Sequence, residues 1–422
     1  MGRWIIAQEL RYSASPVNNS FGGVAVAAPI DGSGAIYWNP ATIGSLYKGE
    51  FQFGFGRSSP PWYGDESLAY SLFIPVTLLI LAIDKQSDFL NDITDSWIYG
   101  DDDSNHSSSS QPHPRKMKIP TVRAWEASYV MAPTAYSHWN YGISVSESGV
   151  RKEQIYLNPA TGNVAGVQIY RVKNIELIPT VSWRNTNRNF SLGFSPIFSI
   201  DEHPTASLPK IPGDDFLGEN RGHFGLGMQF GAYWETKSDF NFGFSVRSPF
   251  FIPKKTYRWY NASNGEIRKS ESFFSQDSPL RFAFGISYNG IDNGLIAMDV
   301  RHYDFQHVNS LYNISNQKKR SVTSFGLGTQ YQMFEGVALR IGYQYSDGNC
   351  SSYEDLLNNA TLPIQHGHSM HYGITLGESE YWDITFAGSH SFGEQKISLG
   401  NGQYADANPN NSTFWWGLRF HF

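Results

Sequence analysis

The strongest pattern along the chain is a strict alternation of apolar and polar residues. From Phe240 to Arg247 every second residue is apolar, and the residues between are Asn, Gly, Ser and Arg. The segments Leu280–Tyr288, Ile296–Arg301 and Leu339–Tyr343 repeat this pattern. A period of two residues is typical of β-strands that have one apolar and one polar face. The polar face of a soluble sandwich would carry more Lys, Glu and Thr, so small residues with occasional arginines favour the lumen of a barrel.

This alternation predicts fourteen strands, most of them close to the ten residues that a tilted membrane strand requires. They cover approximately residues 51–57, 121–131, 139–147, 174–184, 189–200, 222–235, 239–252, 280–288, 294–304, 322–333, 336–345, 370–378, 381–392 and 413–422. Tight turns such as 235–238 and 334–336 alternate with long polar connections. The long connections are 84–120, 149–173, 201–221, 253–279, 305–321 and 346–369. Short turns at one end and long loops at the other are typical of outer-membrane barrels.

The last strand is apolar at every second position and ends on an aromatic residue. Its apolar positions are Phe414, Trp416, Leu418, Phe420 and Phe422. A terminal strand of this kind resembles the sorting signal that the outer-membrane barrel insertion machinery reads. We therefore expect that machinery to be a partner of the chain, recognised through the C-terminal Phe422.

Composition excludes two other classes of protein. The 422 residues include 29 Phe, 24 Tyr, 12 Trp and 40 Gly, only 17% are charged, and the mean hydropathy is −0.38. A helical membrane bundle needs apolar runs of about 18 residues or more, whereas the longest candidate, residues 73–83, contains Pro75. Disordered chains are poor in aromatic residues. A large soluble sandwich and a membrane barrel remain, and the alternation together with the last strand favours the barrel.

Charge and cysteine content add little. The formal net charge is −6 and no basic stretch indicates a nucleic-acid partner. Cys350 is the single cysteine, so it forms no internal disulfide. The apolar run Trp4–Ala7 is too short for a typical signal peptide. Either a signal peptide is encoded upstream of Met1 or the protein is not exported.

The segment before the first strand has a motif of its own. Residues 1–49 are rich in Gly, Ala, Ser, Asn and Pro without sustained alternation, and they contain the runs Asp31–Tyr37 and Asn39-Pro40-Ala41. This segment resembles the N-terminal hatch of the FadL-type outer-membrane transporters. In that family an Asp-Ala-small-Ala-Tyr-x-Asn-Pro-Ala pattern precedes the first strand. Gly225–Tyr233 and Asn241–Pro249 look like a hairpin of the same family.

The resemblance implies a fold and a function. The fold is all-β: a 14-stranded antiparallel transmembrane β-barrel formed by residues 50–422, with residues 1–49 as a hatch inside the lumen. The function is passive uptake of hydrophobic small molecules, such as long-chain fatty acids or aromatic hydrocarbons, across the outer membrane of a Gram-negative-type bacterium. Such a protein needs no catalysis and no cofactor. Its expected partners are this cargo, outer-membrane lipids and lipopolysaccharide, and we expect a monomer.

The hatch residues that match the family pattern are the predicted gating residues: Asp31, Asn39, Pro40 and Ala41. Glycine and alanine allow the hatch to lie close to the barrel wall. Pro40 fixes one φ angle and biases Asn39 toward an extended backbone. The alternative is that Asn39-Pro40-Ala41 is an ordinary turn.

Arginines at the polar positions of strands are the candidate ligand-binding residues. These are Arg247, Arg281, Arg301 and Arg340, and Arg419 and Asp299 are also expected to face the lumen. A charge on the lipid face would cost about 2–4 kcal/mol near the middle of the membrane, so the lumen is favoured. One hypothesis is that an arginine, Arg247 first, pairs with a fatty-acid carboxylate. The alternative is a structural network of arginines with Asp and Glu.

Other motifs do not support a metal site or an active site. Residues 101–105 begin like a calcium-binding loop, but Pro112 occupies the position of the required bidentate Glu. His366, His368 and His371 have metal-like spacing without a nearby cysteine or carboxylate cluster. The chain has no Gly-x-Ser-x-Gly elbow. We therefore expect no metal, no cofactor and no catalytic residue.

Three other functions stay open at this stage. A general outer-membrane porin would pass hydrophilic solutes through an open lumen. A structural or adhesive barrel protein would act through its long loops. A soluble β-sandwich would need no detergent in solution.

Overall fold

The computed structural model describes most of the strands and the segment that precedes them. The described residues are 13, 15–59, 121–131, 137–157, 164–202, 205–208, 215–218, 223–261, 267–276, 278–304, 321–347, 366–378, 381–392, 395–400, 403–407 and 411–422. The apolar run 73–83 and the acidic segment 101–105 lie outside these residues.

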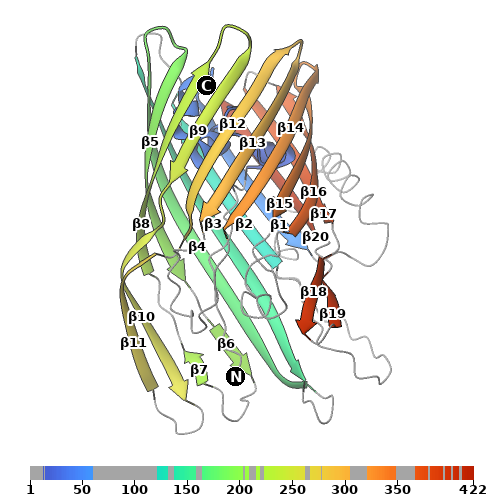
Figure 1. Ribbon diagram of the computed structural model, residues 1–422. Helices are drawn as coiled ribbons and strands as arrows, with labels where there is room; N and C mark the ends of the chain where they lie inside the picture. The colour runs from blue at the N-terminus through green and yellow to red at the C-terminus, as the bar shows by residue number, and fades with distance from the viewer. Residues whose placement is uncertain are drawn as a thin grey trace, which may run out of the picture.

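Fourteen strands of the described chain close into a barrel (Figure 1). They are β1 (Glu50–Ser59), β2 (Thr121–Val130), β3 (Trp139–Leu157), β4 (Val164–Arg184), β5 (Phe190–Glu202), β8 (His223–Glu235), β9 (Phe240–Arg247), β12 (Leu280–Ile291), β13 (Gly294–Asp304), β14 (Val322–Phe334), β15 (Val337–Asp347), β16 (His366–Glu378), β17 (Trp382–Phe392) and β20 (Asn411–His421). Each pairs antiparallel with the next, and β20 pairs with β1, for example Phe420 with Phe51. The closed ring leaves no sheet edge. The prediction of a fourteen-stranded antiparallel barrel is confirmed.

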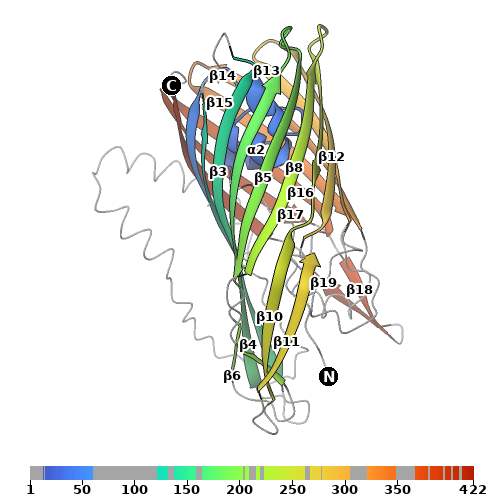
Figure 2. The same cartoon turned by 90° about the vertical axis from the view of Figure 1, so that its left-hand side faces the viewer.

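The remaining strands extend beyond the barrel at the end opposite the C-terminus (Figures 1 and 2). They are β6 (Thr205–Leu208), β7 (Asp215–Gly218), β10 (Phe251–Asn261) and β11 (Ile267–Gln276), and the separate hairpin β18 (Gln395–Gly400) and β19 (Gln403–Ala407). β3 and β4 also run past the barrel and pair with each other as far as Leu157 and Val164. The long connections predicted at 149–173, 201–221 and 253–279 thus contain strands of their own, which the sequence pattern does not predict. They lie beyond the apolar belt, so no lipid-facing alternation marks them as strands.

The predicted strand 239–252 is also wrong at its C-terminal end. β9 stops at Arg247, and Ser248, Pro249 and Phe250 separate it from β10. Proline has no N–H to donate to a ladder. Ser248 keeps this break bonded to β8 through two hydrogen bonds with the Met228 backbone. The Ser248 N–H donates to the Met228 carbonyl at 2.8 Å, and the Ser248 hydroxyl accepts from the Met228 N–H at 2.9 Å.

The outer face of the barrel is apolar, the reverse of a soluble protein. Phe230, Phe284 and Ile341 are 52%, 49% and 56% exposed, and the residue after each is a glycine that faces the lumen. In a bilayer such side chains contact lipid. Of the helices in the described residues, none is long and apolar enough to span a bilayer. The alternation predicted from the sequence thus separates a lipid-facing surface from the lumen.

The short turns and the C-terminus lie at the same end of the barrel (Figure 1). Asp239 and Asn293 occupy left-handed backbone positions, with φ of 62° and 60°, in the β8–β9 and β12–β13 turns. Asp and Asn tolerate this conformation better than most residues. Phe422 and Gly49 exchange two backbone hydrogen bonds of 3.1 Å. The terminal aromatic residue therefore completes the pairing of the last strand with the start of β1.

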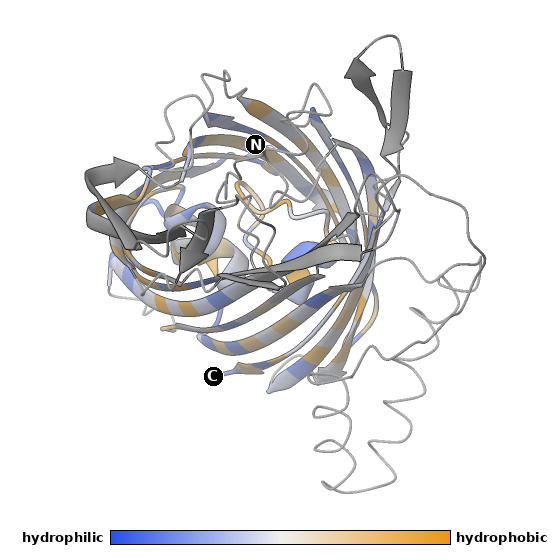
Figure 3. Cartoon of the chain, turned by 90° about the horizontal axis from the view of Figure 1, so that it is seen from below, coloured by the Kyte–Doolittle hydropathy of each residue, from blue (hydrophilic) through white to orange (hydrophobic). Residues whose placement is uncertain are grey.

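Three short helices precede β1 and fill the lumen (Figure 3). α1 (Pro16–Ser20), α2 (Gly32–Trp38) and η1 (Pro40–Ser45) are buried throughout. Their N-caps are Ser15, Asp31 and Asn39, whose side chains accept from backbone N–H groups of the first turn. We call this segment, described from residue 15 to residue 49, the hatch. The assignment of residues 1–49 as one unit stays a prediction.

Candidate functional site: the hatch and the lumen wall

Asp31 joins the two α-helices of the hatch. Its Oδ2 accepts from the Gly34 N–H at 3.3 Å, which caps α2, and from the Ser15 hydroxyl, which caps α1. The next N–H, of Gly32, donates to Glu50 Oε1 on β1. The predicted gating residue Asp31 thus lies where both helices meet the first strand.

Asn39 connects the hatch to the wall. It ends α2 and caps η1, where its Oδ1 accepts from the Ala41 N–H at 3.1 Å and Pro40 begins the helix. Its Nδ2 donates to the carbonyls of Val26, 2.7 Å away in the hatch, and of Ala232, 3.0 Å away on β8. The Asn-Pro-Ala motif is therefore a helix cap that also bonds to the barrel, not an isolated turn.

Glycines of the wall allow this close approach. A Cβ on Gly231 would lie 2.0 Å from Asn39 Oδ1, and a Cβ on Gly193 would lie 2.2 Å from the Ala41 nitrogen. Nearby, the Ser182 hydroxyl donates to the Ala41 carbonyl at 3.1 Å. The small residues on the polar face of the strands thus make room for the backbone of the hatch.

Arg281 binds the C-terminal end of α2. It donates to the Tyr37 carbonyl at 2.8 Å, and its guanidinium lies 4.6 Å from the centre of the Trp38 ring. Cations are stabilised near the C-terminus of a helix and over the face of an aromatic ring. Arg281 therefore holds the helix against β12.

Arg301 and Asp299 together bind the loop between α1 and α2. Arg301 donates to Asp299 Oδ2 at 3.0 Å and to the Gly23 carbonyl. The same Asp299 oxygen accepts from the N–H groups of Ala25 and Val26, at 2.9 and 3.1 Å. Both charged side chains are almost fully buried. This pair positions the hatch through its backbone.

Arg247 lies beside the same helix but makes a different contact. It forms an ion pair of 2.6 Å with Glu176, and its guanidinium lies 5.1 Å from the centre of the Tyr37 ring. In the register of β9 and β12 it is directly opposite Arg281. Among the described residues, Arg247 Nη1 and Arg281 Nε have no hydrogen-bond partner. Each of the two guanidiniums thus has one buried N–H group without an acceptor among the described residues.

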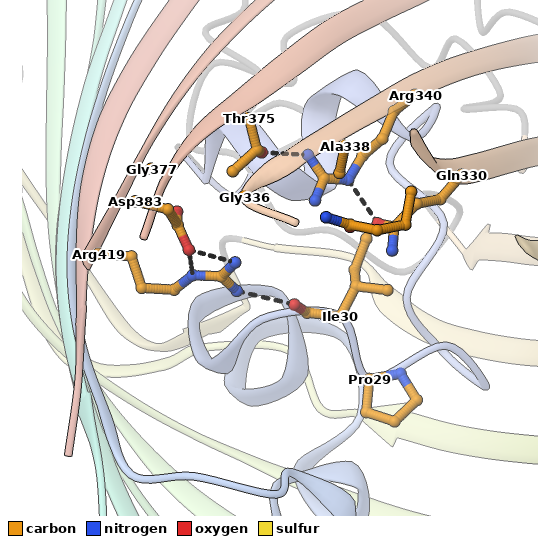
Figure 4. Close-up of a pocket in the computed structure, with 11 residues that line it drawn as sticks. Pro29, Ile30, Gln330, Gly336, Ala338, Arg340, Thr375, Gly377, Asp383 and Arg419 are labelled. Atoms are coloured by element: carbon orange, nitrogen blue, oxygen red, sulfur yellow. Dashed lines mark hydrogen bonds and ion pairs between the residues drawn. The ribbon is translucent and has the colours of Figure 1, made fainter. Parts of the chain in front are cut away.

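Arg340 lies apart from the other three arginines. It donates to Gln330 at 2.7 Å and to the Thr375 hydroxyl, and it lines a cavity of about 270 Å³ (Figure 4). Arg419 lines the same cavity. The structure thus gathers Arg247, Arg281 and Arg301 around the hatch helix and places Arg340 elsewhere. A ligand-binding role for any of the four stays a prediction.

Three acidic residues that pair with lumen arginines are missing from the candidates drawn from the sequence: Glu176, described above, and Asp383 and Glu50. Asp383 accepts from Arg419 Nε at 2.9 Å, and Glu50 lies 3.6 Å from Arg419 Nη1. Arg419 also donates to the Ile30 carbonyl of the hatch at 2.9 Å. Asp383 and Glu50 both face the lumen from barrel strands. Their place at inward positions of the alternation is the sequence feature by which they could have been predicted.

One part of the hatch packs against the wall through apolar side chains. Ile36 and Ile43 of the hatch belong to one buried cluster with Val130, Ile178 and Ile197 of β2, β4 and β5. Each of these side chains is at most 1% exposed. The lumen is therefore not uniformly polar.

The wall beside this cluster has an interrupted ladder. β4 and β5 pair up to Leu177 and Phe198, skip three positions, and pair again from Val181 onward. The skipped positions include Pro179 and Pro196, which have no N–H to donate. The sequence shows both prolines, but only the register places them side by side in the wall. The β4–β5 pairing is thus interrupted for three positions next to the apolar cluster.

The histidine triplet does not form a metal site. His371 Nδ1 contacts the Asn19 carbonyl of the hatch at 2.9 Å, while His368 contacts the Tyr343 hydroxyl. Within the described ranges, no three His, Cys, Asp or Glu side chains are placed to hold a metal ion.

Solved structures resemble this chain over nearly its whole length. The toluene transporter TbuX of Ralstonia pickettii has a TM-score of 0.62 and 14% identity, covering 97% of this chain and 98% of its own. The toluene transporter TodX of Pseudomonas putida has a TM-score of 0.62 and 10% identity, covering 96% and 97%. A FadL homologue of Pseudomonas aeruginosa has a TM-score of 0.63 and 13% identity, covering 99% and 100%. The chain has the fold of the FadL-type outer-membrane transporters.

The predicted resemblance to FadL-type barrels is thus confirmed at the level of structure. No protein-family model matches the sequence, and no curated protein matches it. At 10–14% identity to these three structures the likeness shows the fold alone. The evidence on function therefore comes from the chain's own lumen and hatch.

Proposed function

We propose that the chain is an outer-membrane channel for passive uptake of hydrophobic small molecules. The observation that carries the proposal is a hatch that fills the lumen, with an apolar cluster beside an interrupted part of the wall. Lipopolysaccharide is a poor solvent for apolar solutes, and an open aqueous pore offers them no favourable path. A barrel whose lumen is filled and carries an apolar contact surface offers such solutes a favourable path. Solved barrels with this fold include two toluene transporters and a FadL homologue, which supports the proposal.

We infer that cargo leaves the lumen sideways at the β4–β5 interruption. Ile178 and Ile197 face the lumen there and are buried against the hatch. Because β4 and β5 are unpaired at these three positions, separating the strands there breaks no backbone ladder. An apolar molecule displaced from the cluster would reach the lipid through this part of the wall.

A disulfide across the interruption tests this route. In Ile178→Cys/Ile197→Cys, oxidation joins the two strands where their pairing is missing. We expect the oxidised protein in liposomes to lose most of its uptake of a labelled fatty acid or aromatic hydrocarbon, and reduction to restore it. The control is Ser245→Cys/Ala283→Cys, which joins a directly paired lumen-facing position of β9 and β12. Equal uptake by the oxidised and reduced forms of the first variant would refute a sideways exit here.

The arginines beside α2 favour a cargo with a carboxylate head group. Arg281 has no carboxylate of the described residues within ion-pair distance, and one N–H of Arg281 and one of Arg247 lack acceptors. Buried charges without a counter-charge are unfavourable. A fatty-acid carboxylate would supply both the charge and the acceptors.

Arg247→Ala tests the carboxylate role. Charge-assisted hydrogen bonds contribute about 1.5–3 kcal/mol, so fatty-acid affinity of the purified protein should fall about tenfold or more. The affinity for a neutral hydrocarbon should not change. Val246→Ala, a change at the neighbouring outward position, is the control. Unchanged fatty-acid binding in Arg247→Ala would show that the arginines form a structural network only.

Other functions predict different behaviour. A general porin would conduct ions without removal of the hatch. A structural or adhesive barrel would release no lipid or other apolar ligand when the purified protein is studied by mass spectrometry. Outer-membrane lipids, lipopolysaccharide, the insertion machinery at Phe422 and a monomeric state remain parts of this proposal.

A further inference from the structure

A cavity with a partly polar lining lies between the hatch and the barrel wall, at the end of the barrel that carries the short turns. The cavity of about 270 Å³ is bounded by Pro29 and Ile30 of the hatch and by strands β14–β17 and β20. Gly336, in the β14–β15 turn, also lines it. Arg340 and Arg419 point toward this space from different strands (Figure 4). Small-molecule sites begin at about 300 Å³, so the cavity fits a small ligand or one end of a longer one.

Arg419 is fully engaged by the protein. It forms ion pairs with Asp383 at 2.8 Å and with Glu50 at 3.6 Å, and it donates to the Ile30 carbonyl at 2.9 Å. His421 lies 2.9 Å from the same Asp383 oxygen. This arginine holds the hatch, and its charge is compensated.

Arg340 forms no ion pair of this kind: Asp383 lines the same cavity, but its carboxylate is paired with Arg419 and His421. Only 4% of it is exposed, and its hydrogen-bond partners, Gln330 and Thr375, are both neutral. No carboxylate of the described residues lies within ion-pair distance of it. A desolvated guanidinium without a counter-ion is unfavourable, and planar guanidiniums bind carboxylates in a bidentate manner. The cavity beside Arg340 therefore has the chemistry of an anion site.

The geometry points to a carboxylate-binding subsite in this cavity, where Arg340 binds the head group of an amphipathic cargo molecule. Pro29, Ile30 and Ala338 line the same space and supply apolar contacts for the methylenes next to the carboxylate. The inference rests on the proposed function, because the head group arrives as part of the cargo. The subsite is separate from Arg247 and Arg281, which contact Tyr37 from β9 and β12, two strands that do not line the cavity.

Octanoate labelled with ¹³C at the carboxyl carbon tests the subsite in the purified full chain. Carbon NMR separates each bound carboxylate from octanoate in protein-free micelles. We expect Arg340→Gln, which keeps an amide donor but removes the charge, to abolish one bound resonance. Arg188→Gln, at an exposed arginine in the β4–β5 turn, should keep every resonance.

Ala338→Leu is the second variant, because Arg340→Gln removes a buried side chain and could fail to fold. Leucine at 338 fills the cavity while both arginines remain. It should abolish the same resonance as Arg340→Gln. Retention of all bound resonances in a folded Ala338→Leu protein would overturn the subsite.

Two ligand controls identify the source of the carboxylate. Octanol has the same chain without the charge and should not compete for the resonance that depends on Arg340. Acetate has the charge without the chain and should compete only weakly. Competition by acetate as strong as that by unlabelled octanoate would overturn the assignment to cargo and indicate a free small anion.

The outcome is separable from that of the proposed function. Uptake of a neutral aromatic hydrocarbon into liposomes by the unmodified chain tests the channel alone, because such a cargo has no carboxylate for the subsite. Absence of such uptake by the unmodified chain would contradict the channel. If the unmodified chain shows no bound resonance that Arg340→Gln removes, only the subsite is contradicted.

Discussion

The hatch meets two different sides of the barrel wall. On the side of β12, β13 and β20 its backbone is bound by charged residues: Arg281, Arg301, Asp299 and Arg419. On the side of β4 and β5 the contacts are the apolar cluster around Ile178 and hydroxyls such as Ser182, apart from Arg184 near the strand end. On the first side β12 pairs with β13 at every position from Leu280 to Tyr288, whereas on the second side the β4–β5 pairing skips three positions.

This difference separates anchoring from opening. Buried charged hydrogen bonds are costly to break because the partner left behind stays unpaired. Apolar contacts have no directional requirement and can be replaced by an apolar ligand. The hatch is therefore expected to stay attached at β12–β13 while cargo displaces its contacts at β4–β5.

Displacing the whole hatch gives the largest expected effect. A Cβ on Gly243 would lie 1.9 Å from the Val26 carbonyl oxygen, a backbone atom that cannot move alone. Gly243→Val should therefore push the hatch from the wall and raise the ion conductance of single channels in planar bilayers. Phe244→Val, at the adjacent outward-facing residue, should leave conductance unchanged. Equal conductance of both variants would mean that the hatch does not seal the lumen.

The next prediction compares one contact from each side. Arg301→Gln leaves Asp299 buried without its cation and should lower the free energy of local opening of the hatch by about 3–5 kcal/mol. Ser182→Ala removes one neutral hydrogen bond to Ala41 and should lower it by about 1 kcal/mol. Hydrogen exchange of the amides of Ala25 and Val26, which bond to Asp299, measures the first loss. Similar losses from the two substitutions would remove the distinction between the two sides.

Much of the fold could be predicted from the sequence because lipid and lumen impose opposite requirements on alternate residues. That contrast locates each of the fourteen barrel strands. It gives no signal outside the membrane, where neither face of a strand contacts lipid. Strands β6, β7, β10 and β11 lie beyond the barrel, so no alternation marks them. The predicted end of β9 is too late in the chain because alternation alone does not register the missing N–H of Pro249.

The site was harder to predict because its contacts join distant parts of the chain. Asn39 and Pro40 are recognisable from their motif, but the glycines that receive them, Gly193 and Gly231, are separated from the motif by four strands or more. The inward direction of Arg281 follows from alternation, whereas its acceptor, the Tyr37 carbonyl, depends on how the hatch lies. Backbone carbonyls leave no trace in sequence.

The most direct test of the central claim, that the hatch closes a channel for apolar cargo, is ion conductance in planar bilayers before and after deletion of residues 1–45. A fourteen-stranded barrel is wide enough to leave an aqueous lumen once its interior is vacated. We expect the full chain to conduct poorly and the shortened chain to conduct strongly. An equally high conductance with and without the hatch would contradict the account and identify an open porin.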